Sequence, residues 1–177
     1  MVASSIIILL AGVCFTGAGE EKRAARAIDV KIIKYDGLKE AVRKNRGRVV
    51  LVCFWADWNP PSIVNLSRSV ALQQKYGERG LATMTVEVGA QAREETPQKQ
   101  KKRILNRLTR MKVNVPNFIL DEQPDFIVER LGTFAPYCCA FVFNRQGKWV
   151  RFSAGDSESL VDPMAIEKLV AKFLQEK

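Results

Sequence analysis

Four cysteines and the absence of histidine limit the chemistry that this 177-residue chain can perform. Cys53, Cys138 and Cys139 lie in apolar stretches, where cysteine is usually a small buried hydrophobe, although a thiolate can be a nucleophile or a redox group. Histidine is the commonest acid, base and zinc ligand near neutral pH, so its absence argues against most hydrolases and zinc enzymes. The sequence predicts no metal and no cofactor, and the one enzymatic interpretation that it leaves open is thiol chemistry.

One stretch joins a buried strand to the start of a helix. It closes an apolar run that begins at Val49, and it reads Phe54-Trp55-Ala56-Asp57-Trp58-Asn59-Pro60-Pro61-Ser62. An apolar run of this kind is typical of a strand that is covered on both faces of an α/β sheet. Asn59 followed by two prolines predicts a helix start, because proline in the first turn loses an amide that would be unpaired anyway. The Asn59 side chain is then expected to cap the helix by accepting an amide hydrogen bond.

This stretch resembles the active-site segment of the thioredoxin-like superfamily, in which the pattern is Phe-Trp-Ala-x-Trp-Cys-x-Pro-Cys. Five positions match, namely Phe54, Trp55, Ala56, Trp58 and Pro61. Asn59 and Ser62 stand where the family has its redox cysteines, of which the first is a thiolate at a helix start and the second resolves the mixed disulfide. Because neither residue carries a thiol, dithiol exchange through this Asn59-Pro60-Pro61-Ser62 motif is excluded.

The elements that position this stretch are predicted from hydrophobic periodicity and from caps. A first strand is expected over 28–33, followed by a helix that Asp36 caps and Gly47 ends. The later segments predict strands, helices and one hairpin in this order: strand 49–55, a helix from Asn59 to about Tyr76, strand 81–88, a helix from Thr96-Pro97 to about Lys112, strand 115–120, helix 124–131 with Gly132 as its stop, a hairpin over 135–152, and a helix from Asp162-Pro163.

This order is similar to that of the thioredoxin fold. The predicted fold class is therefore α/β, a thioredoxin fold with a central mixed β-sheet flanked by helices. It carries an extra strand and helix between its two halves, as in the TlpA-like and redoxin branch of the superfamily. A length of 177 residues with 47% hydrophobic content suits one domain, which we expect over residues 28–177.

The first residues predict export. The apolar run from Ile6 to Phe15 is too short to span a bilayer, but it suits the hydrophobic region of a signal peptide, and Ala18/Gly19 is a plausible cleavage point. We expect residues 1–18 to be a signal peptide or a hydrophobic N-terminal anchor with transient membrane association, and residues 19–27 to be a linker. The predicted location is periplasmic or otherwise extracytoplasmic. Val13 precedes Cys14 where lipidation requires a small residue, which disfavours a lipoprotein.

The resemblance also implies a binding surface. Pro136 lies where the family has a cis-proline that faces the active site, and substrate peptides of the family dock along this loop. The residues expected to contact a peptide or protein client are Trp55, Trp58, Pro136 and Tyr137. The alternative for the tryptophans is structural, with Trp55 packing in the core and Trp58 covering the helix end.

The remaining cysteines allow a redox alternative. The resemblance places Cys53 and Cys138 on neighbouring antiparallel strands beneath the site, and alternation sends Cys139 to the opposite face. A Cys53–Cys138 disulfide is one hypothesis, supported by the predicted export and opposed by the strain of bridging adjacent strands. The other hypothesis is that all three cysteines are core residues, and a vicinal Cys138–Cys139 bridge is rarer still.

A basic cluster lies on the helix predicted after Pro97. Its side chains contribute to a formal charge of +9, from 28 basic and 19 acidic residues. Ile104, Leu105, Leu108 and Met111 share one side of this helix, and the basic residues Lys99, Lys102, Arg103, Arg107 and Arg110 share the other. This pattern is typical of an ordinary solvated helix. No interleaved aromatic residues are present to stack bases, so no specific nucleic-acid partner is predicted.

Three functional hypotheses follow. The first is an exported thioredoxin-fold protein without the redox-active cysteine pair, which binds a peptide or protein non-catalytically. The second is an atypical thiol oxidoreductase or peroxidase-like enzyme that uses Cys138 or Cys53. The third is a basic module that adheres to acidic polymers through residues 99–112.

Overall fold

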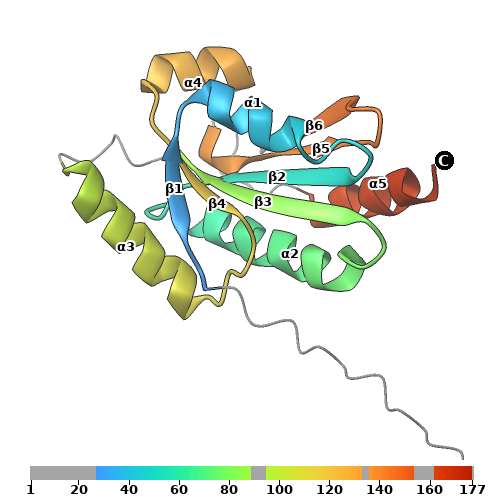
Figure 1. The fold of residues 1–177 in the computed structure, drawn as a ribbon, viewed down its shortest axis with the longest axis horizontal. Coiled ribbons are helices and arrows are strands. Elements are labelled where there is room, and N and C mark those ends of the chain that lie inside the picture. Colours follow the sequence, from blue (N-terminus) through green and yellow to red (C-terminus); the bar gives the residue numbers. More distant parts are fainter. Residues whose placement is uncertain (1–26, 89–94, 133–135, 154–161, 177) are drawn as a thin grey trace, which may run out of the picture.

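A six-stranded mixed β-sheet forms the centre of the computed structural model, which describes residues 27–88, 95–132, 136–153 and 162–176 (Figure 1). Its strands are β1 (Val30–Ile33), β2 (Val49–Trp55), β3 (Leu81–Glu87), β4 (Asn117–Leu120), β5 (Cys139–Phe143) and β6 (Trp149–Ser153). The order across the sheet is β1-β4-β3-β2-β5-β6. Strands β1, β2, β3 and β4 run parallel to one another, β5 is antiparallel to β2, and β6 is antiparallel to β5.

Helices cover both faces of this sheet. In Figure 1, α1 (Tyr35–Arg43) and α4 (Pro124–Leu131) lie on one side, while α2 (Pro60–Tyr76), α3 (Pro97–Arg110) and α5 (Pro163–Gln175) lie on the other. A short 3-10 helix (Pro136–Cys138) leads into β5. The predicted order of elements is therefore confirmed, including the strand and helix (β4 and α3) inserted between the two halves of the fold.

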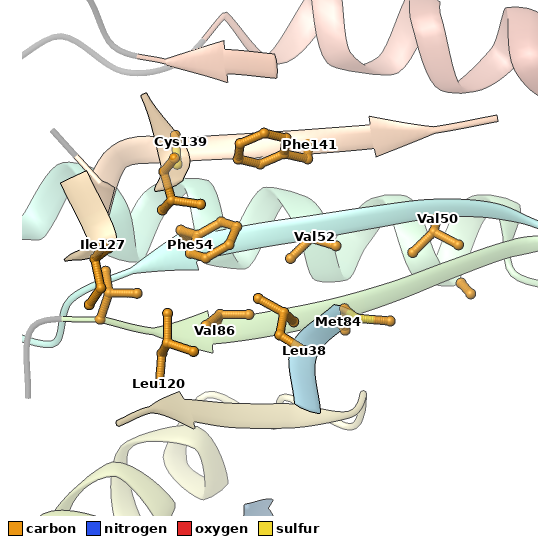
Figure 2. Close-up of a cluster of buried hydrophobic side chains, with 13 residues drawn as sticks. Leu38, Val50, Val52, Phe54, Met84, Val86, Leu120, Ile127, Cys139 and Phe141 are labelled. Atoms are coloured by element: carbon orange, nitrogen blue, oxygen red, sulfur yellow. The ribbon is translucent and has the colours of Figure 1, made fainter. Parts of the chain in front are cut away.

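The strands in the middle of the sheet are buried on both faces, as their sequences predict. Every residue of β2 and of β3 is buried. One side of β2 packs Val50, Val52 and Phe54 into a cluster with Phe141 of β5, which Figure 2 shows. The other side contributes Trp55 to a cluster with residues of α2 and α3. This double burial leaves only the carboxyl end of β2 to lead to the surface.

Four helices begin with proline in their first turn, and at three of them the side chain of the preceding residue caps the helix. Asn59, Thr96 and Asp162 each accept a backbone amide hydrogen bond, as predicted for α2, α3 and α5. At α4 the residue before Pro124 makes no such bond, but Gly132 ends the helix in a left-handed conformation with φ 62°. These local signals explain why the element order could be predicted.

Three predictions of local structure are wrong. Helix α1 ends at Arg43, so Gly47, the predicted stop, lies beyond it in the following turn. Helix α1 begins after Lys34, and Asp36 lies in its first turn, where the exposed carboxylate pairs with Lys39 instead of capping the helix. Cys138 belongs to the 3-10 helix and not to a strand, because β5 begins at the next residue, Cys139. Residues 1–26 lie outside the described residues, and so do the predicted signal peptide, Cys14 and nearly all of the linker. Among the described helices, none is long and apolar enough to cross a membrane.

Candidate functional site

The start of α2 carries the candidate site, because β2 ends at Trp55 and the chain turns at once into the helix. Asn59 occupies the position of the nucleophilic cysteine and acts as the helix cap. Its Oδ1 accepts a hydrogen bond from the Ser62 amide at 2.9 Å. A second donor, the Cys138 thiol, lies 3.5 Å from the same oxygen. Asn59 is thus the predicted cap, and it also connects α2 to the segment that precedes β5.

Ser62 occupies the position of the resolving cysteine, and its side chain has a structural role. The residue is fully buried. Its Oγ accepts a hydrogen bond from the Ala56 amide at 3.1 Å, and it lies 2.9 Å from the Ala56 carbonyl and 2.8 Å from the Asn59 carbonyl, either of which can accept its proton. The hydroxyl therefore closes the turn between β2 and α2. The periodicity of the sequence could not show this bond, because it depends on the path of the turn.

Two aromatic residues of the predicted contact set lie together at this point. Trp58 keeps 41% of its surface exposed, and its ring centroid is 4.8 Å from that of Tyr137 at an angle of 60°. Tyr137 is half-buried and packs against the core cluster that Figure 2 shows. The two residues are 79 positions apart, and together they form an aromatic surface beside the start of α2.

Trp55 does not belong to this surface, which corrects its assignment as a contact residue. Its side chain is fully buried with Leu66, Ile104 and Ile119 in the cluster beneath α2 and α3. The structural alternative given for Trp55 therefore describes it. The path of the chain explains the difference between the tryptophans, because Trp55 is the last residue of the buried strand β2, whereas Trp58 lies in the turn between β2 and α2.

Asp57 anchors the same turn to α3. The residue is buried, and its Oδ2 forms an ion pair with Arg103, whose Nε also donates to Glu95 at 3.0 Å. Arg107 donates to the Asp57 carbonyl oxygen at 3.3 Å. The basic face of α3 is thus not purely solvated as predicted, because Arg103 is half-buried against the site, while Lys99, Lys102, Arg107 and Arg110 are exposed. Sequence reasoning missed this pair because Asp57 and Arg103 are 46 residues apart.

The structure holds Cys53 and Cys138 as free thiols, so the hypothetical bridge between them is not formed in the described part of the chain. Cys53 pairs in register with Ala140, and burial raises the pKa of its thiol to about 12. Burial also raises the pKa of the Cys138 thiol. Cys139 packs with Phe54 and Phe141 on the opposite face of the sheet, as alternation predicted. Raised pKa values disfavour the thiolate that redox chemistry needs.

Pro136 opens the 3-10 helix beside this site, one residue before Tyr137. The predicted cis bond before Pro136 involves Ala135, which lies outside the described residues. Among the described residues, no group of three or more cysteine, aspartate and glutamate side chains could hold a metal ion. The described geometry therefore presents an aromatic surface at a capped helix start, with a protonated thiol beneath it.

Comparisons with solved structures identify the fold. A thiol:disulfide interchange protein of the thioredoxin family from Chlorobium tepidum TLS aligns with 75% of this chain and 83% of its own, at 19% identity and a TM-score of 0.51. A secreted disulfide oxidoreductase from Mycobacterium tuberculosis, homologous to E. coli DsbE, aligns with 73% of this chain and 85% of its own, at 9% identity and a TM-score of 0.53. A secreted thiol-disulfide isomerase from Corynebacterium glutamicum covers 76% and 75%, at 13% identity and a TM-score of 0.53.

No family model and no curated protein matches the sequence. At these identities the structural matches show the fold alone. The chain has a thioredoxin fold, in agreement with the prediction from Phe54 to Ser62. These three solved structures are described as thiol:disulfide or disulfide oxidoreductase proteins, whereas this chain has Asn59 and Ser62 at the two cysteine positions of the motif that it resembles.

Proposed function

We propose that this protein is an exported thioredoxin-fold module that binds an extended peptide or protein segment without catalysing thiol-disulfide exchange. The observation that carries the proposal is the contact between Trp58 and Tyr137 beside the start of α2, where Asn59 replaces the nucleophile. Aromatic side chains bury large areas and lose little conformational entropy, so an exposed pair of them is a strong anchor for a ligand.

The surroundings of the pair support a rigid binding surface. The turn that carries Trp58 is fixed on one side by the Asp57–Arg103 ion pair and on the other by the Ser62 hydroxyl. Tyr137 lies in the 3-10 helix that leads into β5. A surface that is already ordered loses less entropy when it binds, which favours affinity. The site residues of the proposal are therefore Trp58 and Tyr137, together with the backbone at Pro136.

A direct test uses an unfolded polypeptide as the probe, namely reduced and carboxymethylated α-lactalbumin carrying a fluorescent label. Fluorescence anisotropy should show saturable binding to the full-length chain. Trp58→Ala and Tyr137→Ala should each weaken binding by about tenfold or more, the scale of a hot-spot residue. Met164→Ala, which truncates a 59% exposed apolar side chain on α5, is the matched control and should leave binding unchanged. Equal binding by all three variants would contradict the proposal.

A second candidate is an atypical thiol enzyme, and one observation favours it. The Cys138 sulfur lies 3.5 Å from Asn59 Oδ1, which places a thiol at the helix start where the family's nucleophile would be. Its raised pKa opposes this role. Insulin reduction and peroxide consumption should therefore be absent. Turnover that disappears in Cys138→Ala, or in Cys53→Ala, would replace the binding proposal with this one.

Export is the remaining part of the proposal, and the apolar run Ile6–Phe15 with the Ala18/Gly19 cleavage point supports it. Intact-mass measurement of the protein recovered from its native cells should show a chain that begins at Gly19. A chain that keeps residues 1–18 and fractionates with cytoplasmic markers would contradict export while leaving the aromatic binding surface testable by itself.

A further inference from the structure

A cavity of about 450 Å³ lies on the face of the sheet that α1 and α4 cover, between α1, the end of α4 and the β5–β6 hairpin. We propose that it binds a single anionic amphiphile, a fatty carboxylate, with the tail on an apolar floor and the carboxylate at a basic rim. Its volume lies within the range of about 300 to 1,000 Å³ that is typical of small-molecule sites. The cavity shares no lining residue with the Trp58–Tyr137 surface, so this inference is independent of the proposed function.

The floor of the cavity is aliphatic and aromatic. Four of its residues, Leu38, Val50, Val52 and Phe141, belong to the core cluster that Figure 2 shows. Val42 of α1 and Phe143 of the hairpin pack against that cluster and complete the floor. Trp149 lies at its edge with 57% of its surface exposed, and its ring centroid is 5.3 Å from that of Phe141. An exposed tryptophan beside a cavity leaves apolar surface that a hydrocarbon tail could cover, and each buried CH₂ would contribute roughly 0.8 kcal/mol.

The rim is basic. Five cationic side chains line the cavity, Lys39, Arg43, Arg46, Arg48 and Arg130, and no acidic side chain is among its described lining residues. Lys39 pairs with Asp36, and Arg43 pairs with Glu40. Arg48 donates to the Leu81 carbonyl oxygen. Arg46 and Arg130 form no salt bridge with any described residue, although the Arg130 guanidinium lies 5.1 Å from the Phe126 ring centroid, so these two are the cations offered to an incoming carboxylate.

The walls of the cavity are held in place before any ligand arrives. Arg151 of β6 donates to the carbonyl oxygens of Leu131 and Gly132, which ties the hairpin to the end of α4. Glycine suits position 132 because its φ is positive, a conformation that other residues rarely adopt. A cavity between fixed walls is the arrangement expected of a small-molecule site.

The composition of the cavity favours a fatty carboxylate over a nucleic acid. A site for single-stranded nucleic acid needs successive exposed rings along a basic groove. Among the rings that line the cavity only Trp149 is exposed, since Tyr35 and Phe143 are half-buried and Phe141 is 8% exposed within the cluster. A cationic amphiphile of the same length would cover the same floor, but the rim would repel its head group.

Quenching of tryptophan fluorescence tests the proposal, with ω-bromododecanoate added to the full-length chain below its micellar concentration. The bromine should quench Trp149 in a saturable manner, and the bound fraction should fall when unlabelled dodecanoate competes. Trp149→Phe should remove the quenching. Dodecyltrimethylammonium, which has the same tail and the opposite charge, should compete at least about tenfold less well.

Charge reversal at the rim separates this site from non-specific attraction. Arg46→Glu combined with Arg130→Glu should weaken dodecanoate binding by about tenfold or more. The matched control combines Lys102→Glu with Arg110→Glu on α3, which lowers the net charge equally but lies on the other face of the sheet. Equal binding by the two double variants, or no saturable quenching of Trp149, would overturn the proposal. It would also be overturned if the cationic amphiphile competed as well as dodecanoate, or if a short oligothymidylate displaced the quencher.

Discussion

Restoring the two cysteines of the motif is the sharpest test of where the site lies. In the Asn59→Cys/Ser62→Cys variant, the first thiol would sit at the start of α2, where the helix dipole and the amide of residue 62, which Asn59 now caps, would stabilise a thiolate. The second would sit one turn along, in the buried position of Ser62. The helix start, the proline of the motif and the Asp57–Arg103 anchor all stay in place. We therefore expect the variant to catalyse dithiothreitol-dependent insulin reduction, which the natural chain should not.

The structure also sets the cost of this change. Losing the Asn59 cap costs about 1 kcal/mol. Replacing the buried Ser62 hydroxyl, which accepts from the Ala56 amide and donates to the Ala56 or Asn59 carbonyl, costs about 1 to 2 kcal/mol more. The reduced variant should therefore unfold about 2 to 3 kcal/mol more easily in urea. Closing a four-residue loop by a disulfide returns about 2 kcal/mol in the chain-entropy model, so the oxidised variant should lie close to the natural chain.

Two single variants serve as controls. Asn59→Cys alone should form mixed disulfides that accumulate, because no resolving thiol is present, and Ser62→Cys alone should be inert. The reasoning would be refuted if the double variant showed a cooperative unfolding transition and yet neither reduced insulin nor formed an internal disulfide in mass spectra. That result would mean that the start of α2 does not occupy the place of a thioredoxin active site.

Two further predictions concern stability. Arg103→Gln should destabilise the fold by about 3 kcal/mol in urea unfolding, because it leaves the buried Asp57 carboxylate without its cation, whereas Arg107→Gln should cost less than about 1 kcal/mol; equal effects would show that the ion pair does not anchor the turn. Burial raises the pKa of the Cys53 thiol from 9.0 to about 12, so the unfolded chain loses this proton at a lower pH than the folded chain does. The stability from this thiol is therefore full below pH 9. Between pH 9 and 12 the free energy of unfolding falls by up to about 1.4 kcal/mol per pH unit. Cys53→Ala should remove this share of the alkaline loss, and an unchanged slope of unfolding free energy against pH would contradict the burial.

The order of elements could be predicted because its signals are local. A polar residue followed by proline marks the starts of α2, α3 and α5, and continuous apolar runs mark β2 and β3. Local signals fail where two candidates have similar chemistry. Asp36 has the right side chain for a cap, but the cap position is Lys34, two residues earlier, where no side chain caps the helix.

The candidate site was predicted only in part, because its contacts join distant segments. The matching motif correctly indicated that Asn59 caps the helix, since that role follows from a strand end and a helix start. It did not distinguish the buried Trp55 from the half-exposed Trp58, a difference that only the path of the turn decides. The anchor on Arg103 was equally invisible. A helical projection separates apolar from charged faces, but it cannot show that one charge of the polar face meets a buried carboxylate on another element.

The two substitutions at the motif acquire their meaning from the bonds that replaced the thiols. In a dithiol site the turn must accommodate both a disulfide and two separate thiols, so its side chains change partners during each cycle. Here the Asn59 cap and the Ser62 hydroxyl hold the same turn by hydrogen bonds that have no second state, and the Asp57 ion pair fixes it from outside. A turn fixed at three points can hold Trp58 against Tyr137 in one geometry, and rigid presentation of an aromatic pair serves binding better than it serves redox exchange.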